Sequence, residues 1–163
     1  MEITVKKEDI VSALNITLGV VEKRQTLPIL ANVLFEVSEN TFKLTATDLE
    51  SEVTTSGPLL HLESSGKTTT SAKKLNELCR LIPDGEEINL SLSGDKLNIK
   101  TTNGKYSLST LPSSDFPVFD IASGDLPIVI PAKDLRGLIK NTSFAMGNQD
   151  WRHYLNGLYL SIS

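Results

Sequence analysis

Apolar residues recur along this chain at two spacings, one typical of strands and one typical of helices. Alternating apolar positions, rich in β-branched residues and separated by short polar breaks, indicate strands. Apolar positions three and four residues apart indicate amphipathic helices. The pattern predicts helices at 8–21, 72–81 and 132–144. It predicts strands at 2–6, 30–37, 42–48, 51–60, 66–71, 87–93, 96–102, 105–110, 126–130 and 156–163.

The first two predicted helices each carry one apolar stripe, so we expect them to pack side by side against the sheets. Five side chains should lie between them: Leu14, Leu18, Leu75, Leu78 and Cys79. The other side of the second helix should be exposed, and it holds Lys73, Asn76 and Arg80.

The beginning of the chain is repeated near its end. Residues 3–38 align without a gap on residues 128–163, a shift of 125 positions (128 − 3 = 125). The apolar pattern matches, and the identical pairs are Ile3/Ile128, Asp9/Asp134, Thr17/Thr142, Leu30/Leu155 and Ser38/Ser163. Solenoid units run to about 20–50 residues, so this longer period indicates a duplicated domain. We therefore expect a first module at 1–122 and the start of a second, truncated module at 125–163.

The composition argues against several protein classes. One cysteine, Cys79, and two histidines leave no disulfide framework and argue against a structural zinc site. A single cysteine fits a reducing compartment. No apolar run approaches the roughly 20 residues of a membrane helix, and the N-terminus lacks the features of a signal peptide. We therefore expect a cytoplasmic protein with no membrane contact.

The chain is acidic overall, whereas its predicted helices are basic or neutral on their outward sides. The net charge of −4 and the sequence pI of about 5.2 argue against a nucleic-acid ligand. On the third predicted helix, however, the side opposite the apolar stripe carries Lys133, Arg136 and Lys140. Such a stripe is often only a solvated face. Its occurrence in an acidic protein favours a lining that faces an anionic partner.

Candidate catalytic motifs are weak. The tripeptide at 66–68, Gly-Lys-Thr, matches the end of a phosphate-binding loop, but His61 stands where that motif has Gly and a strand-like segment follows. The alternating acidic residues of 48–52 lack a second acidic cluster and are interpreted as a charged strand end. Cys79 lies on an apolar stripe and is interpreted as a core residue. We expect no catalytic site, no metal and no cofactor.

The segment 149–157 concentrates residue types that binding surfaces favour. It contains Trp151, Arg152, His153 and Tyr154 within four positions. Alternatively, Trp151 and Tyr154 cap the core of the second module.

Four segments together resemble the bacterial DNA polymerase III beta subunit, the sliding-clamp family. They keep the family's order and spacing over the whole chain, and they read Thr26-Leu27-Pro28-Ile29-Leu30, Leu44-Thr45-Ala46-Thr47-Asp48-Leu49-Glu50, Leu108-Ser109-Thr110-Leu111-Pro112-Ser113-Ser114-Asp115-Phe116-Pro117 and Gln149-Asp150-Trp151-Arg152-His153-Tyr154-Leu155-Asn156-Gly157. The resemblance implies an α+β DNA-clamp fold with duplicated modules of two helices packed on antiparallel sheets. In that family three modules form a chain and two chains close head-to-tail into a ring. The third module is absent here, so this chain alone would not close a ring.

The resemblance implies a non-catalytic processivity factor of a nucleotidyltransferase holoenzyme. Its helices would line a hole and meet the phosphates of duplex DNA without reading bases. The implied partners are duplex DNA, the DNA polymerase III alpha subunit, the clamp loader, other proteins with a clamp-binding motif, and a second full-length copy.

Site residues follow from the same resemblance. The implied DNA contacts are Arg24, Lys73, Gln149, His153 and Tyr154, with His153 standing where the family has Tyr. The implied peptide pocket includes Arg152 and Leu155. The implied edge that meets a partner chain carries Lys74, Lys96, Lys105, Tyr106 and Leu108, and Asn103 stands where the family can carry Arg.

Two other functions stay open at the level of sequence. The acidic pI and the absence of an Arg-rich patch favour a non-DNA polymer-binding or adhesion module of duplicated α+β units. An ATP-binding enzyme built on residues 66–68 is the third possibility.

Two structural expectations follow from the truncation. Strand 105–110 should be an open sheet edge. The apolar face of residues 125–163 should lack cover, because the rest of its module is absent.

Overall fold

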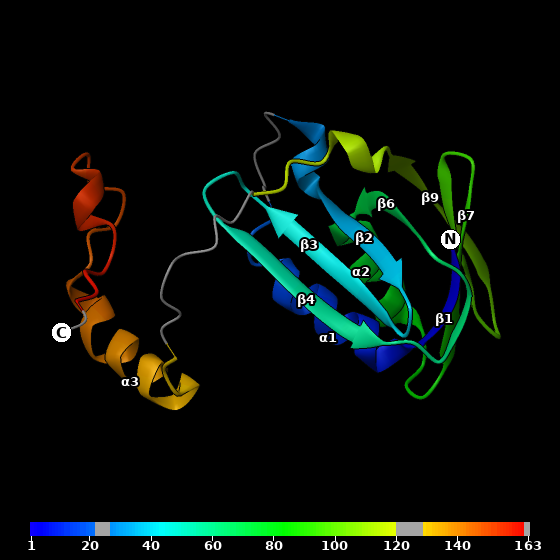
Figure 1. Ribbon diagram of the computed structural model, residues 1–163, viewed down its shortest axis with the longest axis horizontal. Helices are drawn as coiled ribbons and strands as arrows, with labels where there is room; N and C mark the ends of the chain where they lie inside the picture. The colour runs from blue at the N-terminus through cyan, green and yellow to red at the C-terminus, as the bar shows by residue number, and fades with distance from the viewer. Residues whose placement is uncertain (22–26, 120–128, 162–163) are drawn as a thin grey trace. The chain divides into compact units, whose positions relative to one another are not determined.

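The computed structural model describes residues 1–21, 27–119 and 129–161, and the chain divides into two compact units, Met1–Asp120 and Ile121–Ser163 (Figure 1). The elements of the first unit are β1 (Glu2–Lys6), α1 (Lys7–Thr17), η1 (Pro28–Ala31), β2 (Asn32–Ser38), β3 (Thr41–Thr47), β4 (Glu52–Pro58), β5 (His61–Ser64), β6 (Gly66–Ser71), α2 (Ala72–Leu81), β7 (Glu87–Ser93), β8 (Lys96–Lys100), β9 (Lys105–Leu111) and η2 (Ser113–Asp115). Those of the second are α3 (Ala132–Thr142), η3 (Ser143–Ala145) and η4 (His153–Leu155).

The strands of the first unit form an antiparallel sheet in the order β4-β3-β2-β6-β9-β8-β7-β1-β5. The N-terminal strand β1 lies between β7 and β5, with Glu2 opposite Ser91. Two halves of the sheet meet where β6 pairs with β9, and this pairing covers only Thr69↔Leu111 and Thr70↔Thr110. Figure 1 shows α1 and α2 side by side on the face of the strands β2, β3, β4 and β6.

Both halves of the sheet contribute to one core around the two helices. Alternation along β2 and β3 directs Phe35 and Phe42 inward, where their ring centroids lie 5.7 Å apart. The predicted contact between the helices is confirmed. Its fully buried members are Leu14, Leu75 and Cys79, and Leu18 and Leu78 pack partly buried against the same core.

Two predicted elements of the first unit have the wrong extent. Helix α1 ends at Thr17, not at residue 21, and the Thr17 hydroxyl donates back to the carbonyls of Ala13 and Leu14 at 3.3 and 3.1 Å. The predicted strand 51–60 ends at Pro58, because the chain turns there and β5 then pairs with β1. The other boundaries in this unit lie within two residues of the predicted ones.

The second unit consists of α3 followed by two short 3-10 turns, and no residue in 129–161 is buried. The expectation of an uncovered apolar face is confirmed for four of its five residues, Leu138, Ile139, Leu158 and Leu160, which are exposed. The fifth, Leu135, is half-buried, and Phe144, which was not predicted, is exposed as well. The strands predicted at 126–130 and 156–163 are absent from their described parts, 129–130 and 156–161. A strand needs a hydrogen-bonded neighbour, and the described residues supply none for these two segments. No helix in the described ranges is long and apolar enough to span a membrane.

Candidate nucleic-acid interface

The outward side of α2 carries basic side chains. Lys73 Nζ lies 3.9 Å from Glu77 Oε1 one turn further on, and the two side chains are 79% and 60% exposed. Arg80 donates from Nη2 to Asn15 Oδ1 at 2.6 Å, which links α2 to α1. Exposed ion pairs of this kind contribute little to stability. Lys73 is therefore available to an anionic partner.

Asn76 does not share this outward side, which corrects the prediction. The residue is 5% exposed, because it lies about 60° around the helix from the fully buried Cys79. Its Oδ1 atom has no hydrogen-bond partner within the described part of the chain. Only Lys73 and Arg80 of the predicted set remain on the outward side.

Helix α3 presents the basic group that the sequence predicts in the second unit. The three side chains are exposed: Lys133, Arg136 and Lys140. The helix begins after Pro131, whose carbonyl accepts hydrogen bonds from the N–H groups of Asp134 and Leu135 at 2.9 and 3.1 Å. That α3 and α2 line one hole, as the resemblance implies, stays a prediction, because the two helices belong to different units.

Residues 147–156 form a loop closed by hydrogen bonds within itself. The N–H of Asp150 donates to Asn156 Oδ1 at 2.9 Å, and Asn156 Nδ2 donates to the Asp150 carbonyl at 2.9 Å. The N–H of Gly147 donates to the Leu155 carbonyl at 2.8 Å. The interior of this loop consists of its own residues, because the half-buried positions are Gly147, Asp150, Leu155 and Asn156.

An ion pair fixes the arginine of this loop. Arg152 donates from Nε and Nη2 to the two carboxylate oxygens of Asp150 at 3.1 and 3.0 Å, and its N–H donates to Asp150 Oδ1 at 2.9 Å. These bonds, the side-chain ones foremost, hold the pKa of Asp150 below its usual value, and Asp150 in turn raises the pKa of Arg152. The guanidinium also lies 5.7 Å from the centroid of the Trp151 ring.

The loop brings together most of the predicted site residues of the second unit. Gln149, Arg152, His153 and Tyr154 are exposed there, and Leu155 is half-buried. Trp151 and Tyr154 are 82% and 78% exposed, so neither caps a core in this chain. Lys73 belongs to the first unit, and Arg24 lies outside the described residues.

Sequence reasoning missed the two residues that shape the loop, Asp150 and Asn156. Short Asp and Asn side chains commonly bond to main-chain groups in turns. Their separation by six residues around an aromatic segment was the available signal.

The expectation that strand 105–110 is an open sheet edge holds for 105–109, whereas the end of β9 is joined to β6. β9 pairs with β8 at Lys105–Ser109 and with β6 at Thr110 and Leu111. Threonine hydroxyls reinforce the junction, because Thr69 Oγ1 donates to the Leu111 carbonyl at 3.0 Å and Thr70 Oγ1 to the Ser109 carbonyl at 3.2 Å. Residues 105–109 have no second strand partner among the described residues, so the strand is open over this part only.

The predicted partner-edge residues gather around the open part of β9. Lys96, Lys105 and Tyr106 are exposed, and Leu108 is half-buried against the core. A hollow of about 300 Å³ beside the strand is lined by Leu108 and by Lys74 of α2, together with Pro28, Asn32, Ser71, Ser107, Ser109, Thr110 and Leu111. The structure therefore brings Lys74 and Leu108 to one surface.

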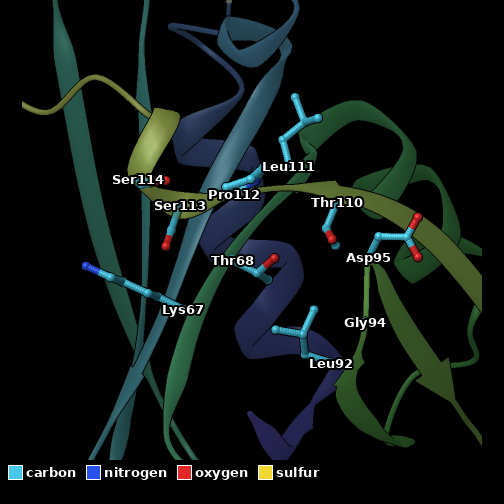
Figure 2. Close-up of a pocket in the computed structure, with 10 residues that line it drawn as sticks. All are labelled: Lys67, Thr68, Leu92, Gly94, Asp95, Thr110, Leu111, Pro112, Ser113 and Ser114. Carbon is cyan, nitrogen blue, oxygen red and sulfur yellow. The ribbon is translucent and has the colours of Figure 1, made fainter.

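A second hollow, of about 370 Å³, lies where β6 meets the turn between β7 and β8. Figure 2 shows Lys67 and Asp95 on opposite sides of it, with Pro112, Ser113 and Ser114 along one border. Residues 66–68 belong to strand β6, so the helix N-terminus that a phosphate-binding loop requires is absent at this tripeptide. The geometry does not support an ATP site there.

The cysteine thiol and the acidic side chains show no reactive or metal-binding arrangement in the described part of the chain. Burial raises the pKa of the Cys79 thiol to about 12, which leaves it protonated and unreactive at neutral pH. Within the described residues, His, Cys, Asp and Glu form no group of three or more that could hold a metal ion.

The sequence profile of the DNA polymerase III beta subunit, N-terminal domain, matches residues 1–120. The chain belongs to this beta-subunit family. It is 40% identical over 163 residues to the beta sliding clamp of Pseudomonas putida, covering all of this chain and 44% of that protein. The chain thus spans less than half the length of the clamp relatives that it matches.

Solved clamp structures have the same fold. The DNA polymerase III subunit beta from Pseudomonas aeruginosa matches with a TM-score of 0.91 at 40% identity, over 96% of this chain and 43% of that one. The sliding clamp from Bartonella birtlesii bound to griselimycin matches with a TM-score of 0.94 at 36% identity, over 100% of this chain and 44% of that one. The α+β clamp fold expected from the sequence is confirmed.

Proposed function

We propose that this chain forms the N-terminal part of a sliding clamp, a non-catalytic subunit that keeps the replicative DNA polymerase on cytoplasmic duplex DNA. The observation that carries the proposal is the family match over residues 1–120, continued at 40% identity to Ser163. The alternative of a non-DNA polymer-binding module has no comparable support.

The DNA-facing surface is the outward side of the helices together with the loop 147–156. Lys73 supplies an exposed cation on α2, and Lys133, Arg136 and Lys140 supply three more on α3. Contacts of this kind, to phosphates and not to base edges, let a protein slide because each position along the duplex is equivalent. Gln149, His153, Tyr154 and Arg24 complete the proposed DNA surface.

The protein partners bind at a further surface, on the second unit. Arg152 and Leu155 form part of a pocket for short peptides of the polymerase alpha subunit, the clamp loader and other clamp-binding proteins. The uncovered apolar face of the second unit is the surface on which the remainder of its module packs. This chain therefore carries one wall of the pocket.

The ring closes through the open part of β9. Consecutive residues of a strand direct their N–H and C=O groups to opposite sides, so residues two apart share a side. The Ser109 carbonyl faces β6, so the main-chain groups of Ser107 and Lys105 face the same, unpaired side. A strand of a second full-length copy adds there, flanked by Tyr106 and Leu108 and by the lysines 74, 96 and 105.

Topology on DNA tests the proposal. The full-length protein, assembled by the clamp loader on closed circular duplex DNA, should stay bound at high salt, and cutting the circle once should release it. A protein held only by local contacts dissociates equally from circular and linear DNA as salt rises. Equal salt-dependent retention on both forms would contradict encirclement.

A further inference from the structure

One side chain, that of Asn156, closes the loop 147–156. Asn156 places both of its polar atoms on the main chain of Asp150, one as acceptor and one as donor, each at 2.9 Å. This pairing fixes the peptide groups on both sides of the Asp150 Cα, and Asn156 is half-buried against them. The side chain of Asp150 is engaged separately with Arg152.

The residue directly before this pairing has an unusual backbone. Gln149 has a φ of 57°, in the left-handed region that residues with a Cβ seldom adopt. Conformations of this kind persist where the surrounding structure fixes them, and they concentrate at functional sites. Because the N–H of Asp150 is held by Asn156, the peptide that follows Gln149 cannot rotate freely.

We propose that Asn156 is a positioning residue that holds Gln149 in the left-handed conformation and so presents the Gln149 side chain to duplex DNA. The presentation to DNA rests on the proposed clamp function, whereas the closure of the loop stands on the geometry of this chain. Asn156 acts through the main chain and does not itself contact DNA.

Hydrogen exchange in the full-length protein tests the closure of the loop. Asn156→Ala should speed exchange of the amides of Asp150 and Gly147 about tenfold, because one or two hydrogen bonds of ordinary net strength are lost. Asn156→Asp keeps the acceptor for the Asp150 N–H but sets a carboxylate oxygen against the Asp150 carbonyl in place of the donor, so exchange at Asp150 should rise in this variant as well. Asn141→Ala, at an exposed position of α3, is the matched control. Unchanged exchange at Asp150 in both Asn156 variants would overturn the proposal.

A double-mutant cycle on DNA affinity tests the presentation of Gln149. Asn156→Ala should weaken binding to duplex DNA about three- to tenfold in the native background and add little in a Gln149→Ala background. Additive losses in the two backgrounds would show that Asn156 does not act through Gln149. If Gln149→Ala alone leaves DNA affinity unchanged, the DNA contact at Gln149 and its presentation are both overturned. Hydrogen exchange then decides the loop closure by itself.

Discussion

Neutralising Lys73 should weaken binding of the full-length protein to duplex DNA in a way that depends on salt. Each phosphate contact contributes a slope of about −0.9 to the logarithm of affinity against the logarithm of salt concentration. Lys73→Gln should therefore make the slope shallower by about 0.9. Between 50 and 200 mM salt, one such contact accounts for about a 3.5-fold change in affinity, since four raised to 0.9 is about 3.5.

Glu77 modulates this contact. Its Oε1 lies 3.9 Å from Lys73 Nζ, so a phosphate competes with this carboxylate for the same ammonium group. An exposed pair one helical turn apart contributes little, which limits the gain from Glu77→Gln to about twofold in affinity. The salt slope should not change in this variant, because the number of phosphate contacts stays the same.

A second lysine–glutamate pair provides the matched control. Lys43 Nζ lies 4.0 Å from Glu36 Oε2 on β3 and β2. The neighbours of Lys43 in sequence, Phe42 and Leu44, are buried under the helices, so alternation directs Lys43 to the other face of the sheet. Salt titrations of binding to a labelled duplex should give native slopes for Lys43→Gln and Glu36→Gln. A Lys73→Gln slope equal to that of Lys43→Gln would refute the placement of α2 against phosphates.

Three further outcomes are expected. Gly57→Ala should destabilise the first unit by about 1–3 kcal/mol in urea unfolding, because a Cβ there would lie 2.6 Å from Phe42 Cε1, and Phe42→Leu should remove most of this effect. An unchanged midpoint would contradict the close contact. Because the pKa of Asp150 is lowered, its ion pair with Arg152 should be complete above the usual carboxyl pKa of 3.8 and should break as pH falls through the lower folded pKa. The NMR signal of the Arg152 Nε–H should report this transition, and Asp150→Asn should abolish the transition. The thiol of Cys79 should react with a thiol reagent only as fast as the first unit opens, and fast labelling of folded protein would count against its burial.

Residue pattern alone predicted the helices and most strands of the first unit, because apolar spacing reports directly on which face of an element is buried. It failed at Asn76, a polar residue beside the stripe that is buried and whose side-chain oxygen has no hydrogen-bond partner among the described residues. It also failed at β5, whose four exposed or half-exposed residues have no buried face to reveal them. The spacing of apolar residues therefore identifies an element only where one side of that element is buried.

The candidate site was predictable in its residue types but not in its shape. Basic residues at helical spacing on α2 and α3 are readable in sequence. The pairing of Asp150 with Asn156 is not, because it depends on a loop conformation that includes the left-handed Gln149. The junction at the end of β9 was missed for a related reason, since the threonine hydroxyls of β6 that bind this end come from about 40 residues away.

The position of β1 between β7 and β5 constrains when this unit can fold during synthesis. Strand β1 pairs on one side with β5, where Glu2 lies opposite Ser64, and on the other side with Glu87–Ser93, so the β7 side of Glu2 has no partner until Ser91 has emerged. At about 5–20 residues per second, the intervening 89 residues (91 − 2 = 89) take roughly 4–18 s to be made. The hairpins β2–β3 and β3–β4 can form within this interval, and β5 becomes available to β1, whereas the β7 side of β1 must wait. The β7-facing edge of Glu2–Lys6 is therefore open to wrong pairing in the nascent chain, and the emergence of β7 ends that exposure.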